Sequence, residues 1–556
     1  MLAKITKVSA ALLLGMTALV SPAKAADQVS LTIVSEFRPL WKRNFNPFLA
    51  TDRLPTTMQF IYEPLVVFNE MKGGEPTYRL ATKHYFSDDL KSLFFELRED
   101  VKWSDGTEFT ADDVVYSLTQ ASKGGTADVQ GLAGHIQSVH RLGKYKVEIK
   151  LKQVNTGIDT QIVRAPIVPR HIFSAVEDIT TFENLEPVGT GPFTEIEVFS
   201  WQVYTQCRNP HYYDNNNLAI DCLKNPIIQN NRQLLAAAIK GRLDWTSSFI
   251  PNIEEVLLSK NASTRYWFPA AGSASFMVNF KTPNVDNRKA FNDINFRRAF
   301  SMAMDRKKIV DEAGAGYWSV NEYPSGLGDQ FEAWADPAVK ANYGKFNTFD
   351  INGAQILLST SGYRDIDGDG FVENPDGSPI KFEILVPKGW SDHIQTVEIG
   401  IEGLTKIGIN ASITTPDFGV LNEQIKSAEF DAAFTNYFAG ANPYRYYYTA
   451  FHSEQMDKAR FGGHHFVDKE LDALIDSFNK TAVESERVAI MHQIENFIGS
   501  RQITMPVFSS NFNFQYDDVS FKGWFSADNP KAIPVVWPDT PERLLHVLDI
   551  EPVSTQ

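Results

Sequence analysis

Short runs of clustered hydrophobic residues alternate along the chain with longer amphipathic runs. The stretches "SLFFELR", "YKVEIKLK", "KFEILVP" and "INASITT" cluster or alternate β-branched and aromatic residues, as strands do. The stretches "NFRRAFSMAMDRKKIVDEA", "IQTVEIGIEGLTKIG" and "KELDALIDSFNKT" place apolar residues at helical spacing. In "FTADDVVYSLTQAS", Thr110 can cap a helix whose first turn carries two acids. This alternation predicts an α/β protein.

The first 25 residues have the pattern of a secretory signal. Lys4 and Lys7 precede the apolar run "AALLLGMTALV", and the small residues Ala23 and Ala25 suit a cleavage site. The run is shorter than the roughly 20 apolar residues that a membrane helix needs. No cysteine stands directly after it, at the position where a lipid anchor would be attached. We therefore predict a signal peptide over residues 1–25 and a protein that diffuses freely in the periplasm.

Length and charge limit the classes of partner. The chain has 556 residues, more than a single core usually organises, so two or three lobes are expected. Its formal net charge is −15 and it has no basic tract, which argues against nucleic acid and anionic membrane surfaces. We expect a monomer that binds neither.

The chain contains two cysteines, Cys207 and Cys222, which lie 15 positions apart. In an oxidising compartment such a pair is typical of one disulfide. Closing a loop of that size contributes about 3 kcal/mol in the chain-entropy model. Two buried free thiols are the alternative.

Signatures of catalysis are missing from the sequence. It has no G-x-S-x-G elbow, no H-E-x-x-H zinc helix and no phosphate-binding Walker loop. We expect a protein that is not an enzyme and requires no cofactor. A secreted carbohydrate-active enzyme remains the alternative from another class, because sequence cannot measure the separation of a carboxylate pair.

One acidic motif has the spacing of a calcium loop. In "DIDGDGFVENPD" the acids stand at alternating positions and then at the ninth and twelfth, with Asp in place of the usual final Glu. The candidate ligands are Asp365, Asp367, Asp369, Glu373 and Asp376. A Gly/Asp-rich turn before the strand "KFEILVP" explains the same residues without a metal. A calcium ion here would stiffen a loop and have no catalytic part.

Several motifs together resemble one family. The segments "IYEPLVVFN", "DDLKSLFFELREDVKWSDGTEFTADDVVYSL", "PVGTGPF", "RNPHYY", "FRRAFSMAMDRKKIV" and "FDAAF" follow the order found in extracellular solute-binding proteins of peptide-type ABC importers, known as family 5. The resemblance implies a type II periplasmic binding protein of two α/β lobes that close over a ligand, with an extra small domain on lobe I. An inner-membrane ABC permease is then the expected partner.

The same resemblance implies a division of the chain. Lobe I is expected in three pieces, residues 26–71, 187–286 and 519–556. The extra α/β domain would fill residues 72–186, and lobe II residues 287–518.

The class of ligand depends on a missing acid. Peptide binders of this family commonly carry an Asp after the "FDaal" strand, where it pairs with the ligand's α-amino group, but here the chain reads "FDAAFTNYFAGANP". A buried ammonium group without a carboxylate partner would cost several kcal/mol. The substitution counts against peptides. An oligopeptide binder remains the alternative, because Asp392 could take over the role.

Sugars require apolar plates flanked by polar side chains, because a pyranose has a C–H face and an edge of hydroxyl groups. Residues of these types follow predicted strands or lie near them: Trp390, Asp392, Asn436, Phe438, Arg460, Phe461 and Trp537. Trp390 and Trp537 are expected on opposite lobes. The aromatic run over residues 444–448 is expected in a loop, where it either lines the mouth of the site or packs beneath it.

Three features resemble the periplasmic chitooligosaccharide-binding proteins of marine bacteria. These are "KGWSD", "NYFAGANPYRYY" and the late Trp537. The resemblance implies N-acetylglucosamine oligomers as ligands, although related glucans would use the same plates. It also implies a membrane chitin sensor kinase as a second partner.

Overall fold

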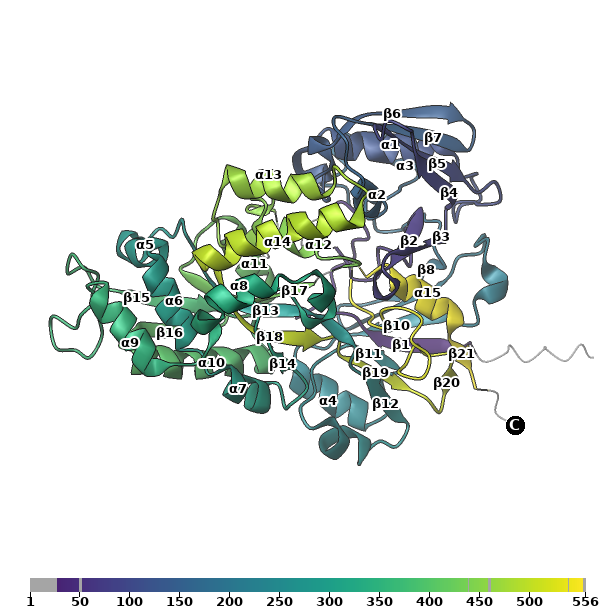
Figure 1. The fold of residues 1–556 in the computed structure, drawn as a ribbon. Helices are drawn as coiled ribbons and strands as arrows, with labels where there is room; N and C mark the ends of the chain where they lie inside the picture. The colour runs from purple at the N-terminus through teal and green to yellow at the C-terminus, as the bar shows by residue number, and fades with distance from the viewer. Residues whose placement is uncertain (1–27, 50–52, 439, 459–461, 539, 554–556) are drawn as a thin grey trace, which may run out of the picture.

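The computed structural model describes residues 28–49, 53–438, 440–458, 462–538 and 540–553 (Figure 1). The predicted signal peptide therefore lies outside the described residues, as do Arg460 and Phe461. Among the helices that these ranges contain, none is long and apolar enough to cross a membrane. The described chain forms two lobes and a small domain, which in Figure 1 lie at the lower right, the left and the top.

Lobe I is built on a seven-stranded sheet in the order β12-β19-β11-β1-β10-β9-β8. Its central strand, β1, pairs in parallel with β10 on one side and β11 on the other. The late strand β19 lies between β11 and β12 and is antiparallel to both. The elements of this lobe are β1 (Ser30–Val34), β8 (Phe193–Phe199), β9 (Val203–Arg208), β10 (Cys222–Pro226), α4 (Asn231–Ile239), β11 (Trp245–Thr246), β12 (Thr264–Trp267), β19 (Phe514–Asp517), β20 (Phe521–Lys522), α15 (Glu542–Asp549) and β21 (Glu551–Pro552).

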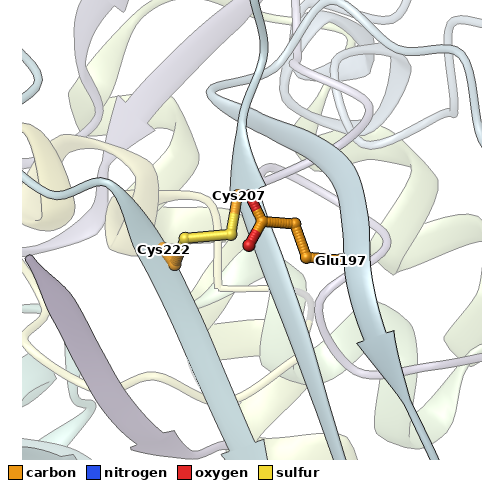
Figure 2. Close-up of side chains that lie close together, drawn as sticks. All are labelled: Glu197, Cys207 and Cys222. Atoms are coloured by element: carbon orange, nitrogen blue, oxygen red, sulfur yellow. A yellow bond between two sulfur atoms is a disulfide. The ribbon is translucent and has the colours of Figure 1, made fainter. Parts of the chain in front are cut away.

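The two cysteines form the predicted disulfide. Cys207 on β9 and Cys222 on β10 are direct partners in the antiparallel ladder, with Cα atoms 4.0 Å apart. Figure 2 shows the Glu197 carboxylate on β8 beside the two sulfur atoms. Because the sulfur atoms are bonded to each other, this trio is a cross-linked sheet position and not a thiolate metal site.

Lobe II is built on a six-stranded sheet in the order β14-β18-β13-β17-β15-β16, in which β15 pairs in parallel with both β16 and β17. In Figure 1, α13 and α14 lie above this sheet and α10 lies below it. The strands are β13 (Ala270–Val278), β14 (Ser319–Val320), β15 (Lys381–Leu385), β16 (Asn410–Thr414), β17 (Ala432–Phe438) and β18 (Thr504–Asn511). The α-helices are α5 (Val285–Asn292), α6 (Ile294–Met302), α7 (Arg306–Lys308), α8 (Pro337–Tyr343), α9 (Ile351–Thr360), α10 (Ser391–Lys406), α11 (Phe418–Lys426), α12 (Tyr444–Phe451), α13 (Lys469–Phe478) and α14 (Glu484–Arg501).

The small domain is a four-stranded antiparallel sheet, β4-β5-β7-β6, covered by helices. Its elements are β4 (Ala81–Phe86), β5 (Ser92–Leu97), α1 (Ala111–Ser122), β6 (Ile136–Gly143), β7 (Lys146–Leu151), α2 (Ile158–Ile162) and α3 (Arg170–Phe173), and the hairpin β2 (Val66–Asn69) to β3 (Glu75–Tyr78) precedes it. The predicted cap of α1 is present, because the Thr110 side chain accepts from Asp112 N and Asp113 accepts from Thr110 N. In this capping box, the two side chains accept hydrogen bonds from backbone N–H groups at the start of the helix.

The chain crosses between the lobes at two places that differ from the expected boundaries. Strand β13 begins at Ala270 and belongs to the sheet of lobe II, although lobe I was expected to extend to 286. Strand β19 begins at Phe514 and belongs to lobe I, although lobe II was expected to extend to 518. The two crossing segments are hydrogen-bonded to each other, with Phe512 N donating to Pro269 O at 2.7 Å. The crossings therefore form one short ribbon that is continuous with both sheets.

Candidate functional site

The sheet topology brings several predicted residues to one edge. In α/β sheets ligands bind outside the carboxyl ends of parallel strands. In lobe II, β15 ends at Leu385 and leads into Trp390, while the parallel strand β17 carries Asn436 and ends at Phe438. In lobe I, β11 ends at Thr246 next to the parallel strand β1. These strand ends are the natural positions for ligand contacts.

Trp390 stands immediately before α10 and is half-buried. Its indole lies nearly parallel to the Phe418 ring, with centroids 5.5 Å apart and an angle of 18° between the planes. The His393 ring stands edge-on to the indole, with centroids 5.0 Å apart. It also stands edge-on to Phe434 on β17, again with centroids 5.0 Å apart. Aromatic contacts thus connect the start of α10 to the strand that carries Asn436, and they fix the plane of the indole.

Asp392 lies in the first turn of α10, two residues after Trp390. Its side chain is half-buried, and desolvation raises the pKa of its carboxyl group to about 6. The backbone N–H groups at the start of the helix favour the charged form and limit the rise. A carboxyl group with a pKa of about 6 is mostly ionised at neutral pH and can then accept hydrogen bonds.

Trp537 belongs to lobe I. Its Nε1 donates to Ser247 O at 2.5 Å, at the carboxyl end of β11, and its ring contacts Phe512 at 5.8 Å. Arg543, which is fully buried, donates to Trp537 O and Val536 O, both at 3.1 Å. The half-buried indole is therefore held on a rigid backbone.

The loop that carries Trp390 lies where the lobes meet. Asn231 Nδ2, on α4 of lobe I, donates to Ser391 Oγ at 3.0 Å. Gly389 adopts a φ of +84°, and an added Cβ would lie 3.1 Å from the Cβ of Asn230. Glycine fits this position because the backbone is left-handed and the opposing lobe is close.

The aromatic run after β17 packs beneath the surface. It was expected as a loop, but Tyr444–Phe451 form α12. The hydroxyl groups of Tyr446 and Tyr447 donate to the O and Oγ atoms of Ser325, at 2.8 and 3.0 Å, and both rings are buried. Of the two alternatives for this run, packing is the one that these side chains follow.

Ser247 and Phe418 were absent from the predicted site, and only one of them has a weak signal in the sequence. Ser247 follows a short apolar strand, as the predicted residues do, whereas Phe418 lies in an ordinary helix start. Asn436 is half-buried on β17 opposite Ala274. The roles of Arg460 and Phe461, which lie outside the described residues, and of the Phe438 side chain stay predictions.

The acidic loop brings three of its five predicted ligands together. Carboxylate oxygens of Asp365, Asp367 and Asp369 lie within 4.8 Å of one another, all on exposed residues. Glu373 accepts from Ile366 N at 2.7 Å inside the same loop, as a turn requires. Asp376 instead pairs with Lys289 at 2.7 Å. Calcium binding stays a prediction, with Asp376 held by a lysine rather than by the loop.

The chain matches one family model and several relatives that are known by name. The model of the bacterial extracellular solute-binding proteins, family 5, matches residues 75–458. The oligopeptide-binding protein AppA of Bacillus subtilis is 24% identical over 436 residues, 74% of each chain. The periplasmic alpha-galactoside-binding protein of Rhizobium meliloti is 24% identical over 401 residues, 63% of this chain and 55% of its own.

A solved structure from Thermotoga maritima, described as a mannohexaose-bound periplasmic oligopeptide-binding protein of an ABC transporter, superposes with a TM-score of 0.86. It is 22% identical, and the match covers 95% of this chain and 99% of that one. The likeness confirms the two-lobe mixed α/β fold.

Proposed function

The chain belongs to family 5 of the bacterial extracellular solute-binding proteins, and from that premise we propose that it captures chitooligosaccharides between its lobes. Proteins of this family are periplasmic, non-enzymatic components of ABC importers. Some relatives are named as peptide-binding proteins, and others are named for or bound to a saccharide. The choice between them for this chain depends on the chemistry of its own residues.

One observation carries the sugar proposal: each lobe presents a half-buried indole held by its own contacts, and Asp392 follows one of them by two residues. Indole rings match the apolar face of a pyranose, and a carboxylate accepts hydrogen bonds from its hydroxyl groups. N-acetylglucosamine adds an amide and a methyl group, which suit Asn436 and the aromatic neighbours of Trp390. Closure would then press one plate from each lobe onto the sugar chain.

Binding of this kind acts through the equilibrium between open and closed lobes. A ligand that contacts both lobes binds the closed state better and shifts the population toward it by its differential affinity. The inner-membrane permease would receive the closed complex. A membrane chitin sensor kinase would be able to distinguish the same form.

An oligopeptide is the second candidate ligand, and Asp392 is the observation that favours it. A half-buried carboxylate at the meeting of the lobes can pair with an ammonium group as well as with a hydroxyl. Direct titration separates the two ligands. The purified protein is mixed with N,N′-diacetylchitobiose or with a tripeptide mixture, and binding is followed by tryptophan fluorescence and calorimetry.

We expect a saturable response to the disaccharide alone. A response to the peptides alone would reject the sugar proposal and assign Asp392 to an amino terminus. Release of a shorter sugar during the incubation would instead indicate an enzyme.

Affinity for the disaccharide should fall as the pH drops through about 6. Burial raises the pKa of Asp392 to about 6 in the free protein, and hydroxyl donors would favour its ionised form in the complex. Binding is thus strongest above that pH and weakens as the carboxylate is protonated. Calorimetric Kd values from pH 4.5 to 8 measure the effect.

The matched control is Asp392→Asn, which keeps one acceptor oxygen and cannot titrate. It should bind about fivefold more weakly at pH 8 and show a flat profile. A profile of the variant that still bends near pH 6 would assign the dependence to another group.

A further inference from the structure

The small domain meets the two lobes in different ways. With lobe I it shares one continuous apolar core, in which Phe95 and Trp103 belong to the same cluster as Trp41, Phe45 and Tyr204. Its described hydrogen bonds to lobe II instead use polar groups near the start of α2 and before β6. Parts of a protein that share a continuous apolar core stay together, whereas parts joined by a few polar contacts separate readily. The small domain therefore forms one body with lobe I, and its contact with lobe II can open.

One contact between the small domain and lobe II lies at the turn between α13 and α14 and comprises several hydrogen bonds. Thr156 N donates to Asn479 O at 2.8 Å, and Thr156 Oγ1 lies 3.0 Å from the same oxygen. Arg487 Nη2, on α14, donates to Thr156 Oγ1 at 2.8 Å. The next residue is Gly157, and an added Cβ there would lie 3.0 Å from Asn479 Cγ. The Asn479 side chain thus packs directly against the Gly157 backbone, where a larger residue would not fit without a shift.

Helix α12 makes two further contacts. Tyr448 OH lies 3.5 Å from His135 Nε2, and the rings are 6.4 Å apart. Arg445 pairs with Glu70, whose Oε1 accepts from Arg445 Nη1 at 2.5 Å and from Arg164 Nη2 at 2.6 Å. Glu70 precedes the small domain on the body side. Because α12 follows β17, the strand of Asn436, one element connects the candidate site to both contacts.

We propose that these contacts form a latch that closes together with the lobes and stabilises the closed state through the small domain. The latch comprises Glu70, His135 and Thr156 on the body and Arg445, Tyr448 and Asn479 on lobe II. Its free energy adds to that of the ligand contacts, so the small domain sets the closed fraction and with it the apparent affinity. The proposal rests on the proposed function only in assuming that closure traps a ligand.

A cysteine pair tests the latch without any ligand. In Gly157→Cys/Asn479→Cys the Asn479 Cγ position becomes that of a sulfur, about 3 Å from the new Cβ, as disulfide geometry requires. Gly157 has a φ of −109°, so a side chain is tolerated by the backbone. We expect rapid intramolecular cross-linking on mild oxidation, read by mass after proteolysis. The control Gly143→Cys/Asn479→Cys should not cross-link; nothing lies within 4 Å of a Cβ at Gly143.

The rate of cross-linking then reports how much the other contacts stabilise the closed state. Adding Arg445→Gln or Glu70→Gln should slow it about fivefold, because each removes the distant ion pair and leaves the cysteines in place. Arg265→Gln, which removes an exposed ion pair of lobe I, should leave the rate unchanged. Absence of the cross-link, or a rate insensitive to both Arg445→Gln and Glu70→Gln, would overturn the latch.

N,N′-diacetylchitobiose provides a separate comparison. If the sugar is the ligand, it should speed cross-linking by raising the closed fraction. A cross-link that depends on Arg445 but ignores the sugar would leave the latch standing and reject the proposed ligand.

Discussion

Replacing either Trp390 or Trp537 with alanine is expected to weaken binding of N,N′-diacetylchitobiose at least about fivefold. Each change removes a plate worth over about 1 kcal/mol of contact with the sugar face. The two residues lie on different lobes, so the losses should add, and the double variant should bind at least about 25-fold more weakly. Calorimetric titration at pH 8 measures all three variants.

Controls for this experiment are present in the chain. Trp201 is 60% exposed at the turn between β8 and β9, so Trp201→Ala should change neither affinity nor stability. Trp390→Phe and Trp537→Phe keep a ring and should retain most of the affinity. If both alanine variants bind as tightly as the parent protein, the proposed site is wrong.

Replacing Arg543 with methionine is expected to lower the free energy of unfolding by about 3–5 kcal/mol. Its guanidinium group is fully buried and donates to four backbone carbonyls, those of Pro55, Met58, Val536 and Trp537, at 2.7–3.1 Å. Methionine fills similar space but removes the guanidinium donor from the Pro55, Val536 and Trp537 carbonyls, whereas the Met58 carbonyl still accepts from Phe60 N. Buried carbonyls that lose a donor are costly. Urea unfolding at pH 7 gives the difference.

Arg265→Met is the matched control. This arginine is 47% exposed and pairs with Asp518 at 3.0 Å, so its loss should cost less than about 1 kcal/mol. The Arg543 variant should also bind ligand more weakly if folded, because the backbone of Trp537 loses its support. A loss below about 1 kcal/mol would show that water replaces the guanidinium.

Elements with a local cause were predictable from the sequence. Thr110 caps α1 because its oxygen and the Asp113 carboxylate satisfy the first backbone amides, a motif contained within four residues. The aromatic run over residues 444–448 was expected as a loop, because its rings fall on every side of the helix and hide the period of 3.6. Its helical form depends on partners far away in the chain, among them Ser325.

The site shows the same division. Trp390 and Asp392 were predicted as ligand contacts because they follow a strand in a Gly-containing loop, and Ser391, which lies between them, contacts Asn231 of lobe I. Their role in binding stays a prediction. Ser247 and Phe418 were not recognisable, since their value lies in holding Trp537 and Trp390 from segments remote in sequence. The crossing points at Ala270 and Phe514 were missed because strand pairing over such distances leaves no local pattern.

The position of β19 has a consequence for how the protein matures. This strand separates β11 from β12, yet it starts at Phe514. The sheet of lobe I therefore remains interrupted until residues beyond 514 have been synthesised, and contacts at such sequence separation form slowly. The sheet of lobe I can therefore be completed only after almost the whole chain is available, so lobe I folds late in synthesis.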